Sequence, residues 1–185
     1  MSHRVCPWWL GYYLASPIRR CLMRPEPIVA PYVKPGMTVL EPGPGMGFFT
    51  LPLAQMVGSK GRVVAIDLQE KMISRLMQRA DKAGLAKSVD ARISGAKSLG
   101  IGDLRDKVSF TLAFAMVHEL PDGHPFFNEV AAASRKGALL LVAEPRGHVK
   151  NEEFAAEVER ATSAGFTVLD RPVIKGSLTA LLQKN

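Results

Sequence analysis

From residue 37 onward, apolar strand-type runs alternate with helix-type stretches, and this alternation limits the fold more than any other feature of the sequence. It is typical of βαβ units, in which helices cover a mostly parallel sheet. Several of the apolar runs are hydrophobic on both faces, as strands covered by helices on both sides must be. The sequence therefore predicts an α/β fold with a buried, mostly parallel sheet.

Seven strands and four main helices are predicted. The strands are 37–42, 62–67, 90–94, 108–115, 138–144, 166–170 and 177–184, and the helices are 48–57, 69–83, 124–135 and 151–164. The last helix is the best specified, with Asn151 as the expected N-cap and Gly165 as the expected stop. Phe154, Val158 and Ala161 form its apolar stripe.

The N-terminal residues 1–36 do not join the alternation. They predict an amphipathic helix at about 8–22, followed by a proline-punctuated stretch at 24–36. We expect residues 1–36 to form a cap or lid on one domain, 37–185, rather than a domain of their own.

The predicted cap helix is rich in aromatic residues. Three interpretations of them stay open: an aromatic wall over an apolar substrate, a membrane-surface contact assisted by Arg19 and Arg20, or packing on the core. The aromatic residues are Trp8, Trp9, Tyr12 and Tyr13.

Size and composition exclude several classes of protein. A chain of 185 residues has room for one ordinary domain. Its 47% hydrophobic and 22% charged residues are typical of a soluble globular protein, and no apolar run approaches the roughly 20 residues of a membrane span. The N-terminus lacks a clean signal-peptide cleavage site.

Neither the charge nor the cysteine content predicts a specialised site. The net charge of +7 is spread without a run of five or more basic residues, which favours a solvated basic surface over RNA affinity. Cys6 and Cys21 are expected to be reduced thiols in a cytoplasmic protein, with a disulfide as the less favoured alternative. No metal site is predicted.

The stretch VLEPGPGMGFFTLPLA, residues 39–54, places three glycines between a strand and a helix. Without Cβ atoms, Gly43, Gly45 and Gly47 let a ligand lie against the backbone, where amide groups can donate hydrogen bonds. The alternative is a tight turn without a ligand. The dinucleotide-binding fingerprint G-x-G-x-x-G needs a small residue at its third glycine position, where this sequence has Phe48. The spacing therefore does not match a dinucleotide site.

The segment LEPGPGMG resembles motif I of the class I S-adenosylmethionine-dependent methyltransferases. The resemblance implies a Rossmann-like, doubly wound sheet of seven mostly parallel strands with an antiparallel last strand. It also places Gly43, Pro44, Gly45 and Gly47 against S-adenosylmethionine and Glu41 near the amino group of this cofactor. A strand-end carboxylate that caps a neighbouring turn is the alternative for Glu41.

Asp67, at the end of the second predicted strand, is expected to accept both ribose hydroxyls of an adenosine ligand. Dinucleotide-binding folds use the same feature, so Asp67 does not distinguish S-adenosylmethionine from a dinucleotide cofactor. The alternative for Asp67 is an exposed aspartate without a ligand. The acid that many family members carry after the third strand is missing. Adenine is therefore expected to contact backbone and the apolar Leu68 and Ala96, and Phe114 is also predicted to contact the cofactor.

The segment MVHELPD, residues 116–122, resembles small-molecule methyltransferases such as those that act on quinone precursors. The Asn/Asp-Pro-Pro-aromatic motif of nucleic-acid amino methyltransferases is absent. We predict catalytic roles for His118, Glu119 and His148, which with Glu144 follow strand ends at one edge. A base is optional for methyl transfer, and a supporting or cofactor-pocket histidine is the alternative for His118.

The leading hypothesis is therefore an S-adenosylmethionine-dependent methyltransferase that transfers the methyl group in line to a small, apolar or aromatic acceptor, with a homodimer as one expected assembly. An RNA or protein methyltransferase is one alternative, and a catalytically silent cofactor-binding module is another. Arsenite methylation is disfavoured, because both cysteines lie in the predicted cap and cannot readily form a trithiolate site.

Overall fold

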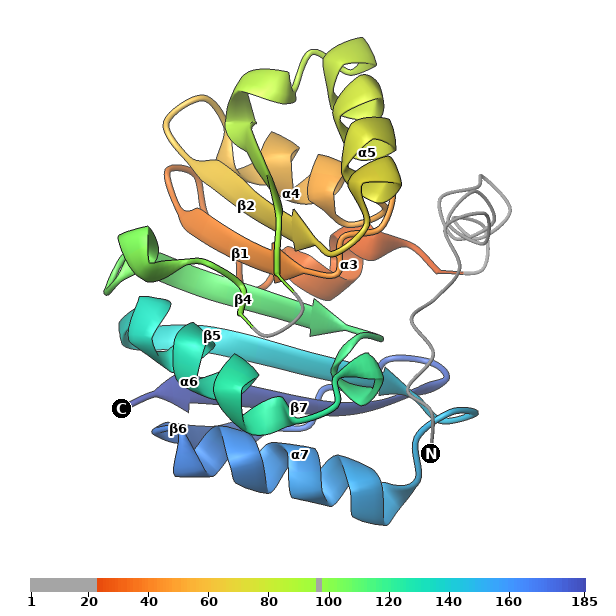
Figure 1. Cartoon of the computed structure of the whole chain (residues 1–185), viewed down its shortest axis with the longest axis vertical. Coiled ribbons are helices and arrows are strands. Elements are labelled where there is room, and N and C mark those ends of the chain that lie inside the picture. Colours follow the sequence, from red (N-terminus) through yellow and green to blue (C-terminus); the bar gives the residue numbers. More distant parts are fainter. Residues whose placement is uncertain (1–22, 96–97) are drawn as a thin grey trace. The chain divides into compact units, whose positions relative to one another are not determined.

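A computed structural model of the chain describes residues 23–95 and 98–185, which are coloured in Figure 1. The chain divides into two compact units, one within residues 5–95 and the other containing residues 96–185. No helix of the described residues is both long and apolar enough to cross a membrane.

The first unit is a three-stranded parallel sheet with helices. Its strands are β1 (Thr38–Pro42), β2 (Arg62–Asp67) and β3 (Val89–Ile93), in the order β3-β2-β1. The helices are α3 (Pro25–Val29), α4 (Thr50–Val57) and α5 (Glu70–Lys82), with a 3₁₀ turn η1 at Ala86–Ser88. In register, Leu40 lies opposite Val64 and Val64 opposite Asp90.

Apolar periodicity explains how the first unit packs. On α5, the buried residues Met72, Ile73, Leu76 and Ala80 recur at helical spacing, so one stripe is buried while charged residues fill the rest. On α4, Pro52 lies within the first turn, where a missing amide breaks no intrahelical hydrogen bond. The sheet supplies equally buried partners, so the core forms between β1, β2 and the helices.

The second unit is a mixed four-stranded sheet. Its strands are β4 (Val108–Phe114), β5 (Ser134–Pro145), β6 (Phe166–Asp170) and β7 (Ser177–Lys184), in the order β4-β5-β7-β6. The pair β4–β5 is parallel, and β7 is antiparallel to both of its neighbours. Helices α6 (Gly123–Ala133) and α7 (Asn151–Ser163) contact each other, and η2 (Gly102–Leu104) and η3 (Val117–Glu119) are 3₁₀ turns.

These elements confirm the predicted fold class, because all seven strands are present and only the pairs of the last strand are antiparallel. The predicted cap helix at 8–22 and its aromatic residues lie outside the described residues. The short helix α3 was not predicted, although its proline in the first turn is a known start signal.

Several predicted boundaries are wrong, and helix α4, for example, begins at Thr50 rather than at 48. The fifth strand begins at Ser134 rather than at 138, because a register shift after Val108 lets β4 pair with Ser134 and ends α6 early. The N-cap of α7 is Lys150 rather than Asn151, and the Lys150 amide donates to Glu153 Oε2 over 2.9 Å. The predicted stop of α7 is correct, since Gly165 follows the helix with a φ of +96°.

Candidate functional site

The glycine turn between β1 and α4 is held by hydrogen bonds to its neighbours. The Gly43 amide donates to the Ile66 carbonyl of β2 over 2.8 Å, and the Gly47 amide donates to Pro44 over 3.0 Å. The Arg79 guanidinium of α5 donates to the Met46 carbonyl at the tip of the turn. Strand β2 and helix α5 therefore fix the turn from two directions.

Two of the glycines are needed for different reasons. Gly45 has a φ of +54°, and a Cβ built there would meet no atom within 4 Å. Gly47 has a φ of +85°, and its Cβ would come within 3.2 Å of Leu76 on α5. Gly47 therefore permits close packing inside the protein, whereas the bare backbone of Gly45 faces open space that can receive a ligand.

Glu41 is a buried acid at the end of β1. Only 3% of the residue is exposed, and its Oε2 atom has no hydrogen-bond partner. Burial raises the pKa of Glu41 to about 8, and the charge of Asp67 adds to this effect. The nearby Thr50 hydroxyl offsets part of the rise in pKa, although its Oγ1 makes no hydrogen bond of normal geometry.

Asp67 ends β2 close to the glycine turn. Burial raises its pKa, and the backbone amides of Gln69, Gly45 and Leu68 oppose this rise. The Gln69 amide donates to Asp67 Oδ1 over 2.9 Å. The first unit therefore brings Glu41, Gly45 and Asp67 together at the carboxyl ends of β1 and β2, where α/β folds bind ligands.

Two exposed apolar side chains flank Asp67. Leu68 follows it in the chain and is 43% exposed, and Ile93 is its register partner on β3 and is 56% exposed. Single exposed apolar residues are common on protein surfaces, so these two are of interest only because both lie beside Asp67. They can provide apolar contacts for a flat ring beside the acid.

In the second unit, the turn after β4 folds around Glu144 of β5. The Glu144 side chain is fully buried, and its Oε1 atom accepts hydrogen bonds from the amides of Met116 at 3.2 Å and Val117 at 2.8 Å. Its Oε2 atom contacts Nδ1 of His118. Ala115 begins this turn with a φ of +54°, a strained conformation for an alanine that often marks functional sites.

The carboxylate partner of His118 increases the affinity of the ring for a proton. Its hydrogen bond to Glu144 raises its pKa above 6.5, burial opposes this, and the charges of Glu144, Glu119 and Glu157 add to the rise. The His148 ring meets the His118 ring edge to face, with centroids 5.9 Å apart. The second unit therefore assembles the predicted catalytic residues around one buried carboxylate.

Glu157 of α7 is a second buried acid near this carboxylate. It is 5% exposed, and its Oε2 atom has no hydrogen-bond partner. Burial raises the pKa of Glu157 to about 8, and the charge of Glu144 adds to this effect, while His118 lowers it. Glu157 is therefore expected to be protonated at neutral pH, which limits repulsion with Glu144.

The predicted site residues fall into the two units. Glu41, Gly43, Pro44, Gly45, Gly47, Asp67 and Leu68 lie in the first unit, and Phe114, His118, Glu119 and His148 lie in the second. Within each unit the predicted residues cluster at the carboxyl ends of parallel strands. Phe114 is half-buried at the end of β4, and Ala96 lies outside the described residues.

Sequence reasoning assigned no role to three residues of these clusters. Glu144 lies in Glu-Pro at the end of β5, as Glu41 lies in Glu-Pro at the end of β1, and this repeat was a usable signal. Glu157 falls three residues after Phe154 on the buried stripe of α7, where an acid is out of place. Ile93 gave no signal, since its exposure depends on the tertiary fold.

Comparison with known proteins identifies relatives along most of the chain. The model of a family described as "Methyltransferase domain" matches residues 33–184. A crystal structure of a SAM-dependent methyltransferase from Aquifex aeolicus superposes with a TM-score of 0.83 and 26% identity, covering 97% of this chain and 98% of that one.

Two curated relatives match more locally. The arsenite methyltransferase of Halobacterium salinarum is 28% identical over 110 residues, which is 60% of this chain and 27% of that protein. The ubiquinone/menaquinone biosynthesis C-methyltransferase UbiE of Hydrogenovibrio crunogenus is 29% identical over 112 residues, or 60% of this chain and 43% of that protein. The chain therefore spans less than half the length of these relatives.

Proposed function

Because the chain belongs to the methyltransferase-domain family, whose members include S-adenosylmethionine-dependent enzymes, we propose that it binds S-adenosylmethionine and methylates a small-molecule acceptor. One observation carries the proposal. The first unit places a buried, unpartnered carboxylate, an open glycine backbone and a strand-end aspartate around one turn. This set matches a ligand with an ammonium group, a sulfonium centre and a ribose.

Each residue of the turn has a proposed role in holding the cofactor. Glu41 pairs with the ammonium group, because its Oε2 atom is buried without a protein partner. Gly45 lets the methionine moiety approach the backbone, and Asp67 accepts the ribose hydroxyls. Leu68 and Ile93 cover the adenine ring, a contact that suits their exposure.

The second unit supplies proton chemistry. S-adenosylmethionine brings an activated methyl group when it is bound, so the main task of the protein is to orient the acceptor, and a base can assist by accepting the acceptor's proton. With Nδ1–H directed at Glu144, neutral His118 accepts the acceptor's proton at Nε2. Glu144 fixes this tautomer and stabilises the ring once it is charged. Glu119 and His148 flank His118 and are proposed to orient the acceptor.

A small acceptor is favoured over RNA by two features of the second unit. The segment after β4 forms η3 around Glu144 rather than presenting an Asn/Asp-Pro-Pro-aromatic motif for a flipped base. The His118 and Glu144 side chains are only 22% and 0% exposed, so a group that reaches them has to enter a confined space.

Isothermal titration with S-adenosylmethionine, S-adenosylhomocysteine and NAD tests the cofactor proposal. We expect the first two to bind and NAD not to bind. Gly45→Ala is expected to weaken binding about tenfold or more, because the added methyl group occupies the space beside the backbone. It should also cost about 1 kcal/mol of stability, because alanine resists a positive φ.

Gly84→Ala is the matched control. Gly84 has a φ of +70°, and a Cβ there also meets no atom within 4 Å, but it lies after α5 and away from the turn. Equal losses of stability with loss of cofactor affinity only in Gly45→Ala would support the proposal. Unchanged affinity in a folded Gly45→Ala variant would overturn it.

A further inference from the structure

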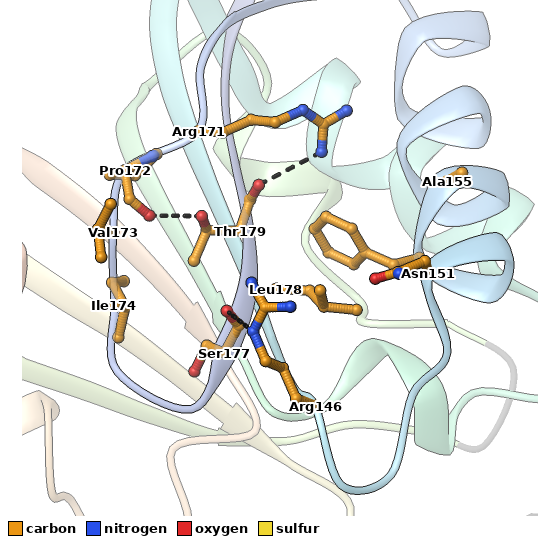
Figure 2. A pocket seen from close by; sticks show the side chains of 11 residues that line it. Arg146, Asn151, Ala155, Arg171, Pro172, Val173, Ile174, Ser177, Leu178 and Thr179 are labelled. Carbon is orange, nitrogen blue, oxygen red and sulfur yellow. Dashed lines mark hydrogen bonds between the residues drawn. The ribbon is translucent and has the colours of Figure 1, made fainter.

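A pocket of about 350 Å³ lies in the second unit, between helix α7 and the β6–β7 loop. This volume is at the lower end of the range for small-molecule sites, roughly 300–1,000 Å³. Figure 2 shows the pocket from close by. It is lined by Arg146, Asn151, Phe154, Ala155, Arg171, Pro172, Val173, Ile174, Ser177, Leu178 and Thr179.

The walls of the pocket are apolar, and its charges have one sign. Phe154, Val173, Ile174 and Leu178 provide the apolar surface, and Val173 is fully exposed. Two arginines line the pocket, but no acidic residue does. A pocket of this composition suits a ligand with an apolar body and a negative charge.

Both guanidinium groups are anchored to the β6–β7 hairpin. Arg146 Nε donates to the Ser177 carbonyl over 3.2 Å, and Arg171 donates to the Thr179 carbonyl over 3.5 Å. In Figure 2 they enter the space between β7 and α7 from opposite sides. Among the described residues neither makes a salt bridge with a carboxylate.

Helix α7 begins at the pocket but adds little positive charge to it. Helix α7 has 13 residues and presents its first residue, Asn151, to the pocket. Glu152 and Glu153 in its first turn offset the positive end of the helix dipole, so the positive charge at the pocket comes from the two arginines. Asp170, which precedes Arg171 in the sequence, accepts a hydrogen bond from the Arg171 backbone amide. It does not pair with the Arg171 guanidinium group, which can therefore bind a ligand in the pocket.

The pocket lies at the same end of β5 as Glu144 and the His118 ring that Glu144 contacts. Leu178 of β7 is the register partner of Glu144, so the two side chains project from the same face of the sheet. Arg146 follows Glu144 by two residues and precedes His148 by two, and the His148 ring contacts His118. A ligand in the pocket is therefore expected to lie near these residues.

On this basis, and resting on the proposed function, we infer that the pocket is the acceptor site and that the acceptor is a small amphipathic anion. Its apolar body packs against Phe154 and Leu178, and its carboxylate or phosphate group binds Arg146 and Arg171. The anionic group is thereby held at the pocket, while the atom to be methylated extends toward His118. The sequence alone predicted only an apolar or aromatic acceptor.

Binding of simple probes to the full chain tests the inference. By isothermal titration, 3-phenylpropionate and phenyl phosphate are expected to bind about tenfold more tightly than the uncharged 3-phenyl-1-propanol, because only the anions pair with the arginines. Whichever of the two anions binds more tightly indicates whether the acceptor carries a carboxylate or a phosphate group. Equal binding of both anions and the alcohol would overturn the inference.

Variants locate the site. Arg146→Gln and Arg171→Gln are each expected to weaken anion binding about tenfold, with Arg135→Gln as the control of equal charge at the opposite end of β5. If Arg146→Gln does not fold, Arg146→Lys serves as the second variant. It keeps the positive charge and should retain most of the affinity for the anions. Equal weakening in Arg135→Gln would mean that net charge, and not the pocket, binds the anion.

Titration of S-adenosylhomocysteine into the same samples separates the two proposals. Binding of this cofactor product without binding of the anions would overturn the acceptor site alone. Binding of the anions without the cofactor product would overturn the proposed methyltransferase function and leave an anion pocket.

Discussion

Glu41 and Glu144 both lie in a Glu-Pro pair at the end of a strand, yet their hydrogen bonding differs. Each lies one residue before the proline that ends a parallel strand, β1 or β5, and each is buried. Glu144 is held by two backbone amides and by the His118 ring. Glu41 leaves one oxygen without a partner, and its pKa rises to about 8.

The contrast shows that burial alone does not determine what a strand-end acid does. A carboxylate with internal donors organises the turn around it and helps to stabilise the fold. A carboxylate without them stays protonated at neutral pH and can be ionised when a cation arrives. In this interpretation, Glu144 is a structural and positioning acid and Glu41 is a ligand-binding acid.

Glu144→Ala is expected to cause the largest loss of stability. It removes the acceptor for the Met116 and Val117 amides and for the His118 ring at a fully buried position. We expect the free energy of unfolding to fall by about 3 kcal/mol, measured by urea denaturation. Glu152→Ala, at an exposed position in α7, should change it by less than about 0.5 kcal/mol. A similar small loss in Glu144→Ala would remove the contrast with Glu41.

The opposite sign is expected for Glu41→Gln at pH 8. The folded state keeps a proton on Glu41 between pH 4.5 and about 8, whereas the unfolded state loses it near pH 4.5. The free energy of unfolding therefore falls as the pH rises through this interval, and a glutamine escapes the fall. We expect a gain of about 4 kcal/mol at pH 8 and less than about 1 kcal/mol at pH 5, measured by denaturation at both values. A gain of equal size at both pH values would contradict the raised pKa.

The folding pattern could be predicted from the sequence because it depends on local periodicity. Alternating apolar runs identified all seven strands, and the glycine turn after Glu41 could be recognised from its spacing alone. The start of β5 was missed, because residues 134–137 are polar and join the strand only through pairing with β4. Family and cofactor were predicted correctly from the same glycine motif.

The chemistry of the site was less predictable, because it depends on which groups meet in space. The sequence placed Glu144 and His118 at one edge, but not the pairing of Glu144 with the Val117 amide. The pocket combines Arg146 with Arg171 across a hairpin, and no local pattern links these positions. The acceptor, the homodimer, the cytoplasmic location and the 1–36 cap stay predictions.

A third prediction sharpens the contrast through proton release. When the ammonium group of S-adenosylhomocysteine pairs with Glu41, the pKa of Glu41 should fall and its proton should leave. At pH 7 most of one proton is expected to be released, so affinity should rise by nearly tenfold per pH unit below pH 8. Calorimetry in buffers of different ionisation enthalpy measures the release.

Two controls assign this proton to Glu41. Glu41→Gln should bind without the release, and so should 5′-methylthioadenosine with the unmodified protein, because this ligand lacks the ammonium group. Release of a full proton with 5′-methylthioadenosine would mean that another group titrates.

The smallest effect concerns the other side of the comparison, the His118 ring. Its pKa lies above 6.5 chiefly because it is hydrogen bonded to Glu144. This interaction stabilises the protein fully below pH 6.5 and is lost as the pH rises through the raised pKa. Glu144→Gln keeps the size of the side chain and an acceptor for the Val117 amide but removes the charge, so the His118 pKa should fall. NMR titration of the ring, assigned with His118→Gln, measures the change. A His118 pKa that is unmoved in Glu144→Gln and falls instead in Glu119→Gln would transfer the positioning role from the buried Glu144 to the half-buried Glu119. The contrast between Glu144 and Glu41 would then lose its basis.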